Sequence, residues 1–425
     1  MSKFKEEVIE VKIDKLVNGG QGLGTMSDGR KVFVWNALPT ETVRARTLKQ
    51  KRSYSEAITE EVITASAERI QPLEQNYLAT SPWQIMTFEA ENKYKKTIVE
   101  ELFAHEKVSL PSFGETIHEV DEWHYRNKME YSFWGDDAGV HLALHLRGSH
   151  GKEIVEGSAL AMAAVDIGAN AICKQLSSLQ TRAGDLKTII VRCDQKGNVV
   201  AALYVKLEKF TTLTLPEELK GLRVYYSNPL SPASVPTRLL QESGELKLQD
   251  ELLGKSFTYD VDSFFQVNLP IFEKALERIK QYCKSASLID MYAGVGSIGL
   301  SVASERVNLI ELDAATAAMA RVNAKASGLD ANVIESSTEK VLEYISGAEP
   351  VIFDPPRAGL HDNVIARVLE VQPSQVIYLS CNPSTHARDL AKLQEAYSID
   401  FFEVYNFFPR TPHIETLAVL SRKTT

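Results

Sequence analysis

The sequence has few cysteines, and their spacing argues against the common protein metal sites. It contains four cysteines in 425 residues, at Cys173, Cys193, Cys283 and Cys381, and no two have the CxxC spacing. Structural zinc and iron–sulfur sites usually draw on such closely spaced pairs. We therefore expect reduced thiols, as in a cytosolic protein, and no bound metal.

Long apolar runs and an excess of positive charge are also missing. The nearest candidate for a membrane span, residues 158–173, is short and contains Asp166, so it predicts a packed helix. Residues 1–14 have no apolar core of the signal-peptide type, so we expect a cytoplasmic protein without membrane contact. The net charge of −9 excludes a strongly basic coat. It does not exclude nucleic acid, because local patches decide such binding.

The chain is long enough for two or three domains. Residues 4–62 alternate apolar and polar side chains between glycine-rich turns, which predicts five short strands in a small OB-like β-barrel. Residues 63–88 and 111–260 are interpreted as a central mixed α+β domain, and residues 89–110 as a helix that packs on the C-terminal domain. From residue 261 to 425, strands alternate with helices, which is typical of a doubly wound α/β sheet.

Basic residues gather on the later half of the predicted barrel and on one central strand. A local basic patch suits RNA contact, and a solvated strand face is the competing interpretation. The candidate RNA-binding residues are Arg44, Arg46, Lys49, Lys51 and Arg52 in the barrel and Arg126 and Lys128 in the central region.

A glycine-rich turn, AGVGSIG at 293–299, follows one predicted strand and opens a helix. Glycines let a ligand approach the backbone closely. Asp290 precedes the turn, and Glu311 ends the next strand, where a carboxylate can accept both hydroxyls of a ribose. The loop lacks the full dinucleotide spacing and a Walker lysine. It therefore favours a nucleoside ligand without phosphates, such as S-adenosylmethionine.

Two later strands end at reactive side chains. The run VIFD ends at Asp354, and the run VIYLS is followed by Cys381. Ligands bind beyond the carboxyl ends of parallel strands, so we expect both groups at one edge of the sheet. The pKa of a free thiol is about 8.5, and it can fall where a strand end opens onto a helix N-terminus. A rigid Asp354-Pro355-Pro356 turn and a small buried cysteine are the competing interpretations.

Together these segments resemble the RNA 5-methyluridine methyltransferase family, which depends on S-adenosylmethionine. The resemblance implies a Rossmann-like class I methyltransferase domain over 261–425, and residues 4–62 look like the TRAM domain often fused to these enzymes. The matching motifs are DSFFQVN at 262–268, DMYAGVGSIGL at 290–300, FDPPRAGL at 353–360, SCNPSTHARDL at 380–390 and FPRTPHIET at 408–416.

The family also implies roles for single residues. Cys381 would attack C6 of uracil, and Glu415, which alone would more often be a surface residue, would be the general base that removes the C5 proton. The implied cofactor-binding residues are Gln266, Tyr292, Gly294, Gly296, Ser297, Glu311, Ser337 and Asp354.

The chain departs from the family at two informative positions. Many relatives carry a four-cysteine iron–sulfur site after the TRAM domain, but Ser81 stands about where a cysteine is expected, so we predict no cluster. Ser337 replaces an acidic or amide residue that often contacts the cofactor.

The RNA substrate is left open by the sequence. Ribosomal RNA, specifically 23S, is favoured over transfer RNA because the TRAM domain more often accompanies ribosomal-RNA members. Methylation at another position, as in cytosine-C5 enzymes that also use cysteine, and a non-enzymatic RNA-binding protein on a methyltransferase scaffold are the alternatives. We expect a monomer.

Overall fold

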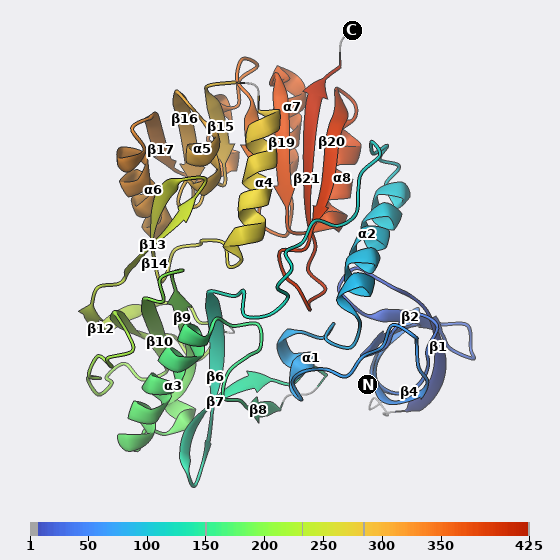
Figure 1. Cartoon of the computed structure of the whole chain (residues 1–425), viewed down its shortest axis with the longest axis vertical. Helices are drawn as coiled ribbons and strands as arrows, with labels where there is room; N and C mark the ends of the chain where they lie inside the picture. The colour runs from blue at the N-terminus through green and yellow to red at the C-terminus, as the bar shows by residue number, and fades with distance from the viewer. Residues whose placement is uncertain (1–6, 149–150, 232, 284, 424–425) are drawn as a thin grey trace.

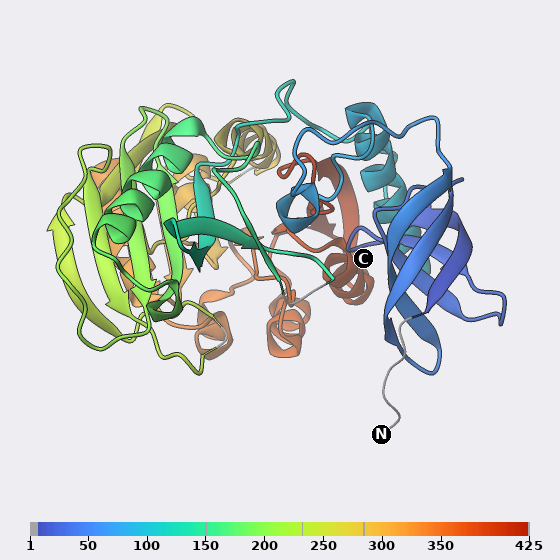
Figure 2. The same cartoon turned by 90° about the horizontal axis from the view of Figure 1, so that it is seen from below.

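The computed structural model describes residues 7–148, 151–231, 233–283 and 285–423. Its three parts follow one another along the chain: a barrel, a central sheet and a C-terminal α/β part (Figure 1). Seen from below, the barrel and the central sheet lie on opposite sides of the C-terminal part (Figure 2). The outermost residues of two predicted ranges, 4–6 and 424–425, lie outside the described residues.

The first part is a closed five-stranded barrel in the order β1-β2-β3-β5-β4, as the sequence predicts. Alternate side chains point inward, and Val11, Val32, Val34 and Val43 form its core. The strands are β1 (Val8–Leu16), β2 (Gly22–Thr25), β3 (Lys31–Trp35), β4 (Thr42–Gln50) and β5 (Tyr54–Thr64).

Two helices, α1 (Tyr77–Thr80) and α2 (Phe88–His105), connect the barrel to the rest of the chain. Thr87 caps α2 by accepting a hydrogen bond from the Ala90 backbone N–H. Ile98, Val99 and Phe103 on α2 are buried in the same core as α8 (Pro383–Leu393) of the C-terminal part. The helix ends at His105 and not at residue 110 as predicted. The chain turns shortly after the helix, at Lys107, which has a φ of 57°. No helix among the described residues is both long and apolar enough to cross a membrane.

The central part is a seven-stranded sheet in the order β12-β11-β10-β9-β6-β7-β8. Helix α3 (Ala163–Ser178) covers one face, and it contains most of the segment predicted to be a packed helix. The hairpin of β13 (Lys247–Leu252) and β14 (Lys255–Asp260) packs on part of the other face. The strands are β6 (Lys128–Asp136), β7 (Gly139–His145), β8 (Lys152–Ile154), β9 (Leu186–Cys193), β10 (Val199–Val205), β11 (Gly221–Tyr226) and β12 (Arg238–Gly244). A 3-10 turn at Ala183–Asp185 directly precedes β9.

The C-terminal part is the predicted doubly wound sheet, in the order β17-β16-β15-β18-β19-β21-β20. Its first five strands are parallel, whereas β21 is antiparallel and lies between β19 and β20. The chain leaves β15 toward one edge and returns at β18 toward the other, so a topological switch point lies between these two strands. The strands are β15 (Leu288–Met291), β16 (Arg306–Glu311), β17 (Asp330–Glu335), β18 (Val351–Phe353), β19 (Gln375–Ser380), β20 (Tyr397–Tyr405) and β21 (Glu415–Arg422), and the remaining helices are α4 (Leu269–Tyr282), α5 (Ser297–Val302), α6 (Ala314–Ser327) and α7 (Asp362–Val371), with 3-10 turns at Thr338–Lys340 and Leu342–Tyr344.

Candidate active site

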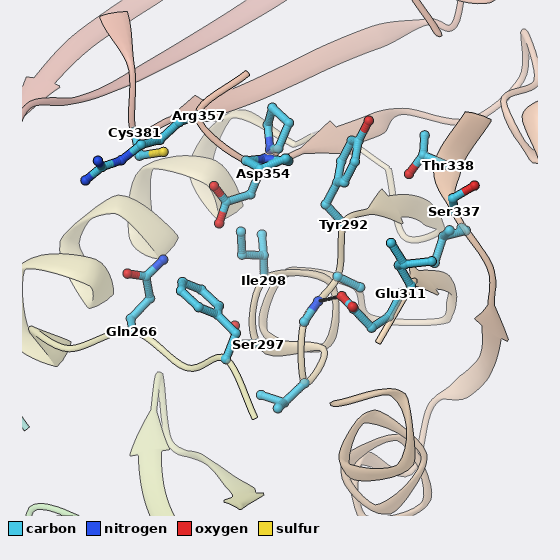
Figure 3. A pocket seen from close by; sticks show the side chains of 18 of the residues that line it. Gln266, Tyr292, Ser297, Ile298, Glu311, Ser337, Thr338, Asp354, Arg357 and Cys381 are labelled. Carbon is cyan, nitrogen blue, oxygen red and sulfur yellow. Dashed lines mark hydrogen bonds between the residues drawn. The ribbon is translucent and has the colours of Figure 1, made fainter. Parts of the chain in front are cut away.

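A cavity of about 610 Å³ opens at the switch point, beyond the carboxyl ends of β15, β16 and β18. Cys381, Arg357 and Gln266 lie toward one end and Glu311 and Ser337 toward the other, with Asp354 between them (Figure 3). The cavity therefore brings together residues that lie far apart in the sequence. The predicted site residues that line it are Gln266, Tyr292, Gly294, Ser297, Glu311, Ser337, Asp354, Cys381 and Glu415.

The glycine-rich turn forms one wall of the cavity. Gly294 has a φ of 57°, and a Cβ built there would meet only Phe264, at 4.0 Å, so the turn is open toward the cavity. Gly296 was predicted to bind the cofactor, but it is not among the lining residues. Its φ is 86°, and a Cβ there would lie 2.9 Å from Leu300. The structure thus gives Gly296 a part in shaping the turn.

Two carboxylates anchor this turn. Asp290 Oδ2 accepts a hydrogen bond from the Gly299 backbone N–H at 2.7 Å, at the start of α5. Glu311 accepts from the backbone N–H of Gly294 at 2.9 Å and of Asp313 at 2.8 Å. Burial raises the pKa of Asp290 to about 8, and its Oδ1 has no hydrogen-bond partner among the described residues. The turn is thereby tied to both neighbouring strands.

The charges on the lining fit S-adenosylmethionine and not a phosphate-bearing nucleotide. Glu311, Glu339, Asp354 and Glu415 line the cavity, and Arg357 is the one lysine or arginine among the described lining residues. Glu311 and Glu339 in this lining disfavour phosphates and favour a ligand that carries a sulfonium and an ammonium group. Further carboxylate lone pairs on Glu311 remain for ribose hydroxyls, because each carboxylate offers about four acceptor sites.

At the reaction end, burial raises the pKa of all three functional groups. The pKa of Asp354 rises to about 7, and that of Glu415 rises well above its usual value because of burial and the nearby Asp354. The expected fall in the pKa of Cys381 is wrong for this structure, in which the pKa rises to about 12. Burial is the main cause, and the Glu415 and Asp354 carboxylates outweigh the opposing effect of Arg357.

Buried polar contacts hold the loop that leads to Glu415. Glu91 and Lys95 on α2 form a fully buried ion pair at 3.0 Å. Glu91 accepts hydrogen bonds from the Asn406 side chain and from the Arg410 backbone N–H, and Lys95 donates to Asn406 Oδ1 and the Phe408 carbonyl. The helix that links the barrel to the sheet thus fixes the course of residues 406–410.

A second cavity, of about 270 Å³, meets the first at the thiol. Arg357, Cys381 and His413 line both cavities. The second cavity is bounded on its far side by residues 18–19 of the barrel and by Arg147 of the central part. Cys381 therefore lies between the cofactor-type cavity and an opening toward the barrel.

The predicted RNA-binding residues fall into different environments. Arg44 and Arg46 on β4 form ion pairs with Glu61 and Glu60 on β5. Lys49 pairs with Glu56, whereas Lys51 and Arg52 are exposed. The guanidinium of Arg126 lies 5.7 Å from the ring centre of Phe408, which lines the first cavity, and burial lowers the pKa of Lys128 to about 8.

Ser81 is fully buried in a polar network. Its Oγ accepts a hydrogen bond from Gln84 Nε2 at 2.8 Å, and the same amide nitrogen donates to Glu74. Gln84 Oε1 in turn accepts from the backbone N–H groups of Leu73 and Glu74. Residues 73–84 are thus held together by one glutamine side chain.

Several lining residues were not singled out from the sequence, among them Phe264, Arg357 and His413. Phe264 has 62% of its surface exposed although it lines the cavity, a position open to stacking with a flat ligand. Arg357 lies beside His413, whose pKa falls to about 3 because of burial and of nearby cations, so this imidazole is neutral. Arg357 and His413 stand in the quoted motifs, but only the fold shows that they meet at Cys381.

The doubly wound sheet, the glycine-rich turn at its switch point and the acidic nucleoside-sized cavity define a class I methyltransferase. The sequence model of the tRNA (Uracil-5-)-methyltransferase family matches residues 87–423, so the chain belongs to this family. It is therefore an S-adenosylmethionine-dependent RNA methyltransferase that acts on C5 of uracil.

Proteins similar to this chain agree with that assignment. RNA methyltransferases described as uncharacterized, from Fusobacterium nucleatum and Thermotoga maritima, are 26% and 27% identical to it. The alignments cover 98% and 97% of this chain and 96% and 98% of theirs. The crystal structure of Pyrococcus abyssi tRNA (uracil-54, C5)-methyltransferase with S-adenosyl-L-homocysteine shares the fold, with a TM-score of 0.77, 19% identity and coverage of 96% of this chain and 100% of that one.

Proposed function

We propose that this protein methylates C5 of a uridine in RNA through a covalent bond between Cys381 and C6 of the base. The observation that carries the proposal is the position of Cys381 at the junction of two cavities. One cavity has the lining expected for the cofactor, and the other opens to the surface between barrel and catalytic sheet. A uracil that enters from the second cavity would meet the thiol and the methyl donor from opposite sides.

C5 of uracil is a poor nucleophile, so the enzyme must activate it by adding a nucleophile of its own to C6. When bound, S-adenosylmethionine supplies a methyl group on a sulfonium. The Cys381 thiolate adds to C6, and the electrons of the C5–C6 double bond pass to the C4 carbonyl as an enolate. C5 then takes the methyl group, whose bond to sulfur would break with the electron pair left on the sulfur as a neutral thioether. The Glu415 carboxylate accepts the C5 proton, the double bond re-forms, and the Cys381 thiolate leaves.

Both of these groups must lose a proton before they can act. Burial raises the pKa of both Cys381 and Glu415, which favours their protonated forms in the free protein. Arg357 is the neighbouring cation that favours the thiolate. We propose that Asp354 and Gln266 hold the cofactor and the reacting face, and that Tyr292, Gly294, Ser297, Glu311 and Ser337 bind the rest of the cofactor.

We propose 23S ribosomal RNA as the substrate, with transfer RNA as the second candidate. The TRAM-like barrel beside the second cavity supports ribosomal RNA. The Pyrococcus abyssi structure supports transfer RNA, because it is that of a tRNA (uracil-54, C5)-methyltransferase and its alignment, over 96% of this chain, includes most of the barrel.

The test combines methyl transfer with covalent trapping. Labelled S-adenosylmethionine is incubated with unmodified 23S ribosomal RNA and transfer RNA transcripts, and a 5-fluorouridine form of each transcript is used to trap the adduct. We expect label in 5-methyluridine of one RNA and a stable adduct with its fluorinated form. Cys381→Ala should lose both, whereas Cys283→Ala, a partly buried cysteine outside both cavities, should keep both.

Two results would contradict the proposal. Methyl transfer that survives in Cys381→Ala would remove the cysteine from the mechanism. Cofactor binding without methyl transfer or adduct in either RNA would favour a non-enzymatic RNA-binding role or another substrate.

A further inference from the structure

A polar hollow of about 530 Å³ lies on the central sheet, outside the site described above. It is bounded by β6, β7, β8 and β9 on the sheet face opposite α3. Lys152, Lys187 and Lys206 converge on it together with His145, and Glu130 is the one carboxylate among its described lining residues. In a chain with a net charge of −9, this is a local concentration of positive charge.

One of the three lysines has a structural task. The Lys187 ammonium lies within hydrogen-bond distance of Ser227 Oγ and of the carbonyl oxygens of Asn228, Ser231 and Ala233. It therefore holds the loop that rims the hollow. All of its donors have acceptors within the chain.

The other two lysines keep donors for a ligand. Lys152 donates to the Phe133 carbonyl at 3.2 Å, and Lys206 donates to the Gly184 carbonyl at 3.0 Å. No carboxylate of the described chain lies within ion-pair distance of either ammonium, whereas Arg44, Arg46 and Lys49 of the barrel each have a glutamate partner. Burial and the nearby Lys206 lower the pKa of Lys152, so a bound anion would relieve a repulsion that the chain itself leaves in place.

The hollow is connected to the reaction centre by the β7–β8 hairpin. His145 pairs with Lys152 across this hairpin, and Arg147 follows two residues later. Arg147 lines the second cavity beside Cys381, and its guanidinium lies over the Trp35 ring of the barrel at 4.0 Å. Two residues span at most about 7 Å, so the hollow and the cavity lie close together along the chain. In Figure 1, β8 lies on the side of the central sheet that faces α1.

We propose that this hollow binds backbone phosphates of the RNA substrate, with Lys152 and Lys206 as the contacting groups. The inference rests on the proposed function, because the target uridine must reach Cys381 through the neighbouring cavity. Lysine ammonium groups bind phosphate as point charges and carry no sequence information. The central part, and not the arginines that are already paired on the barrel, then supplies the salt-dependent part of RNA affinity.

The test is RNA affinity as a function of salt. The Lys152→Ala/Lys206→Ala double variant should bind the unmodified substrate transcript about tenfold more weakly than the wild type. The magnitude of the slope of log affinity against log salt should fall by about 1 to 2 between about 50 and 200 mM salt. Lys174→Ala/Lys325→Ala removes two exposed lysines from α3 and α6 and should match the wild type. Lys152→Arg/Lys206→Arg should restore most of the affinity, because it keeps the charge.

One control and two results separate the outcomes. Adduct formation with 5-fluorouridine RNA at saturating concentration should be unchanged in the double alanine variant, which shows that the fold and Cys381 are intact. A wild-type affinity and salt slope in that variant would overturn the proposal. A wild-type protein that binds RNA with the salt slope but forms no adduct would overturn the proposed function and leave the phosphate site standing.

Discussion

The barrel and the C-terminal part place their ionisable side chains in opposite environments, exposed and paired in the first and shielded from solvent in the second. On the barrel, Arg44 and Glu61 are both about half exposed and neutralise each other across two strands. At the reaction centre, the half-buried Asp354 and the buried Glu415 lie near a thiol, and desolvation raises the pKa of every one of these groups. Exposed ion pairs contribute little to stability and shift pKa values little, whereas burial without a full partner shifts the pKa values of the groups that must exchange protons during the reaction.

The largest effect is expected on turnover, when Glu415, the proposed general base of the reaction centre, is replaced. Glu415→Gln keeps the shape of the side chain but cannot accept the C5 proton, so turnover should fall by about 10² to 10⁴. The methylated RNA should then stay bound to Cys381, and labelled methyl groups should migrate with the protein in a denaturing gel. Glu395→Gln, an exposed control, should turn over normally. Fast turnover in Glu415→Gln would assign the base elsewhere.

The second prediction concerns how much the buried ion pair Glu91–Lys95 contributes to the free energy of unfolding, for comparison with the exposed pair Arg44–Glu61. Glu91→Gln leaves Lys95 buried without its carboxylate, which should lower the free energy of unfolding by about 3 to 5 kcal/mol in chemical denaturation. Replacing both residues, as in Glu91→Gln/Lys95→Met, should recover part of that loss, because no unpaired charge then remains. A single variant as stable as the wild type would show that the pair does not hold the loop.

A smaller effect concerns cofactor binding and pH. The Asp354 carboxyl has a pKa of about 7 in the free protein, so it is neutral below pH 7 and anionic above it. The affinity for the cationic cofactor should rise with pH, by up to about tenfold per unit below pH 7, and level off above. Titration calorimetry should show this rise in the wild type and in Asp362→Asn, an exposed control, but not in Asp354→Asn. An equal pH dependence in Asp354→Asn would point to a different titrating group.

The smallest effect is expected on the barrel. Arg44→Ala breaks an ion pair whose two side chains are 50% and 55% exposed, so the free energy of unfolding should change by less than about 1 kcal/mol. RNA affinity should change less than in the Lys152→Ala/Lys206→Ala variant, since Arg44 already has a partner. A larger loss of RNA affinity in Arg44→Ala would reverse the comparison and make the barrel the main phosphate-binding surface.

Features set by local sequence were predictable. A glycine that follows a helical pattern predicts a helix end, and α6 ends at Gly328, which adopts the left-handed conformation at a φ of 72°. The apolar run at 417–420 predicts a strand and lies within β21. Alternation, helical spacing and glycine punctuation act over a few residues, so the sequence displays them directly.

Features set by contacts between distant segments were not predictable. The raised pKa of Cys381 depends on its burial in the packed fold and on Glu415, which approaches only because β21 pairs with β19. The partners of Arg44 and Arg46 depend on the register of β4 against β5. The sequence identified the candidate groups of the site, but their protonation and pairing required the packed structure.

The position of β21 also bears on how the enzyme assembles. Strand β20 is made before β21 but contacts the sheet only through it, since β21 lies between β19 and β20. Strand β20 can therefore join the sheet only with β21 or after it. The pairing of β21 with β19 also brings Glu415 near Cys381, so the reaction centre is complete only when this strand, the later of the two in the chain, has joined the sheet.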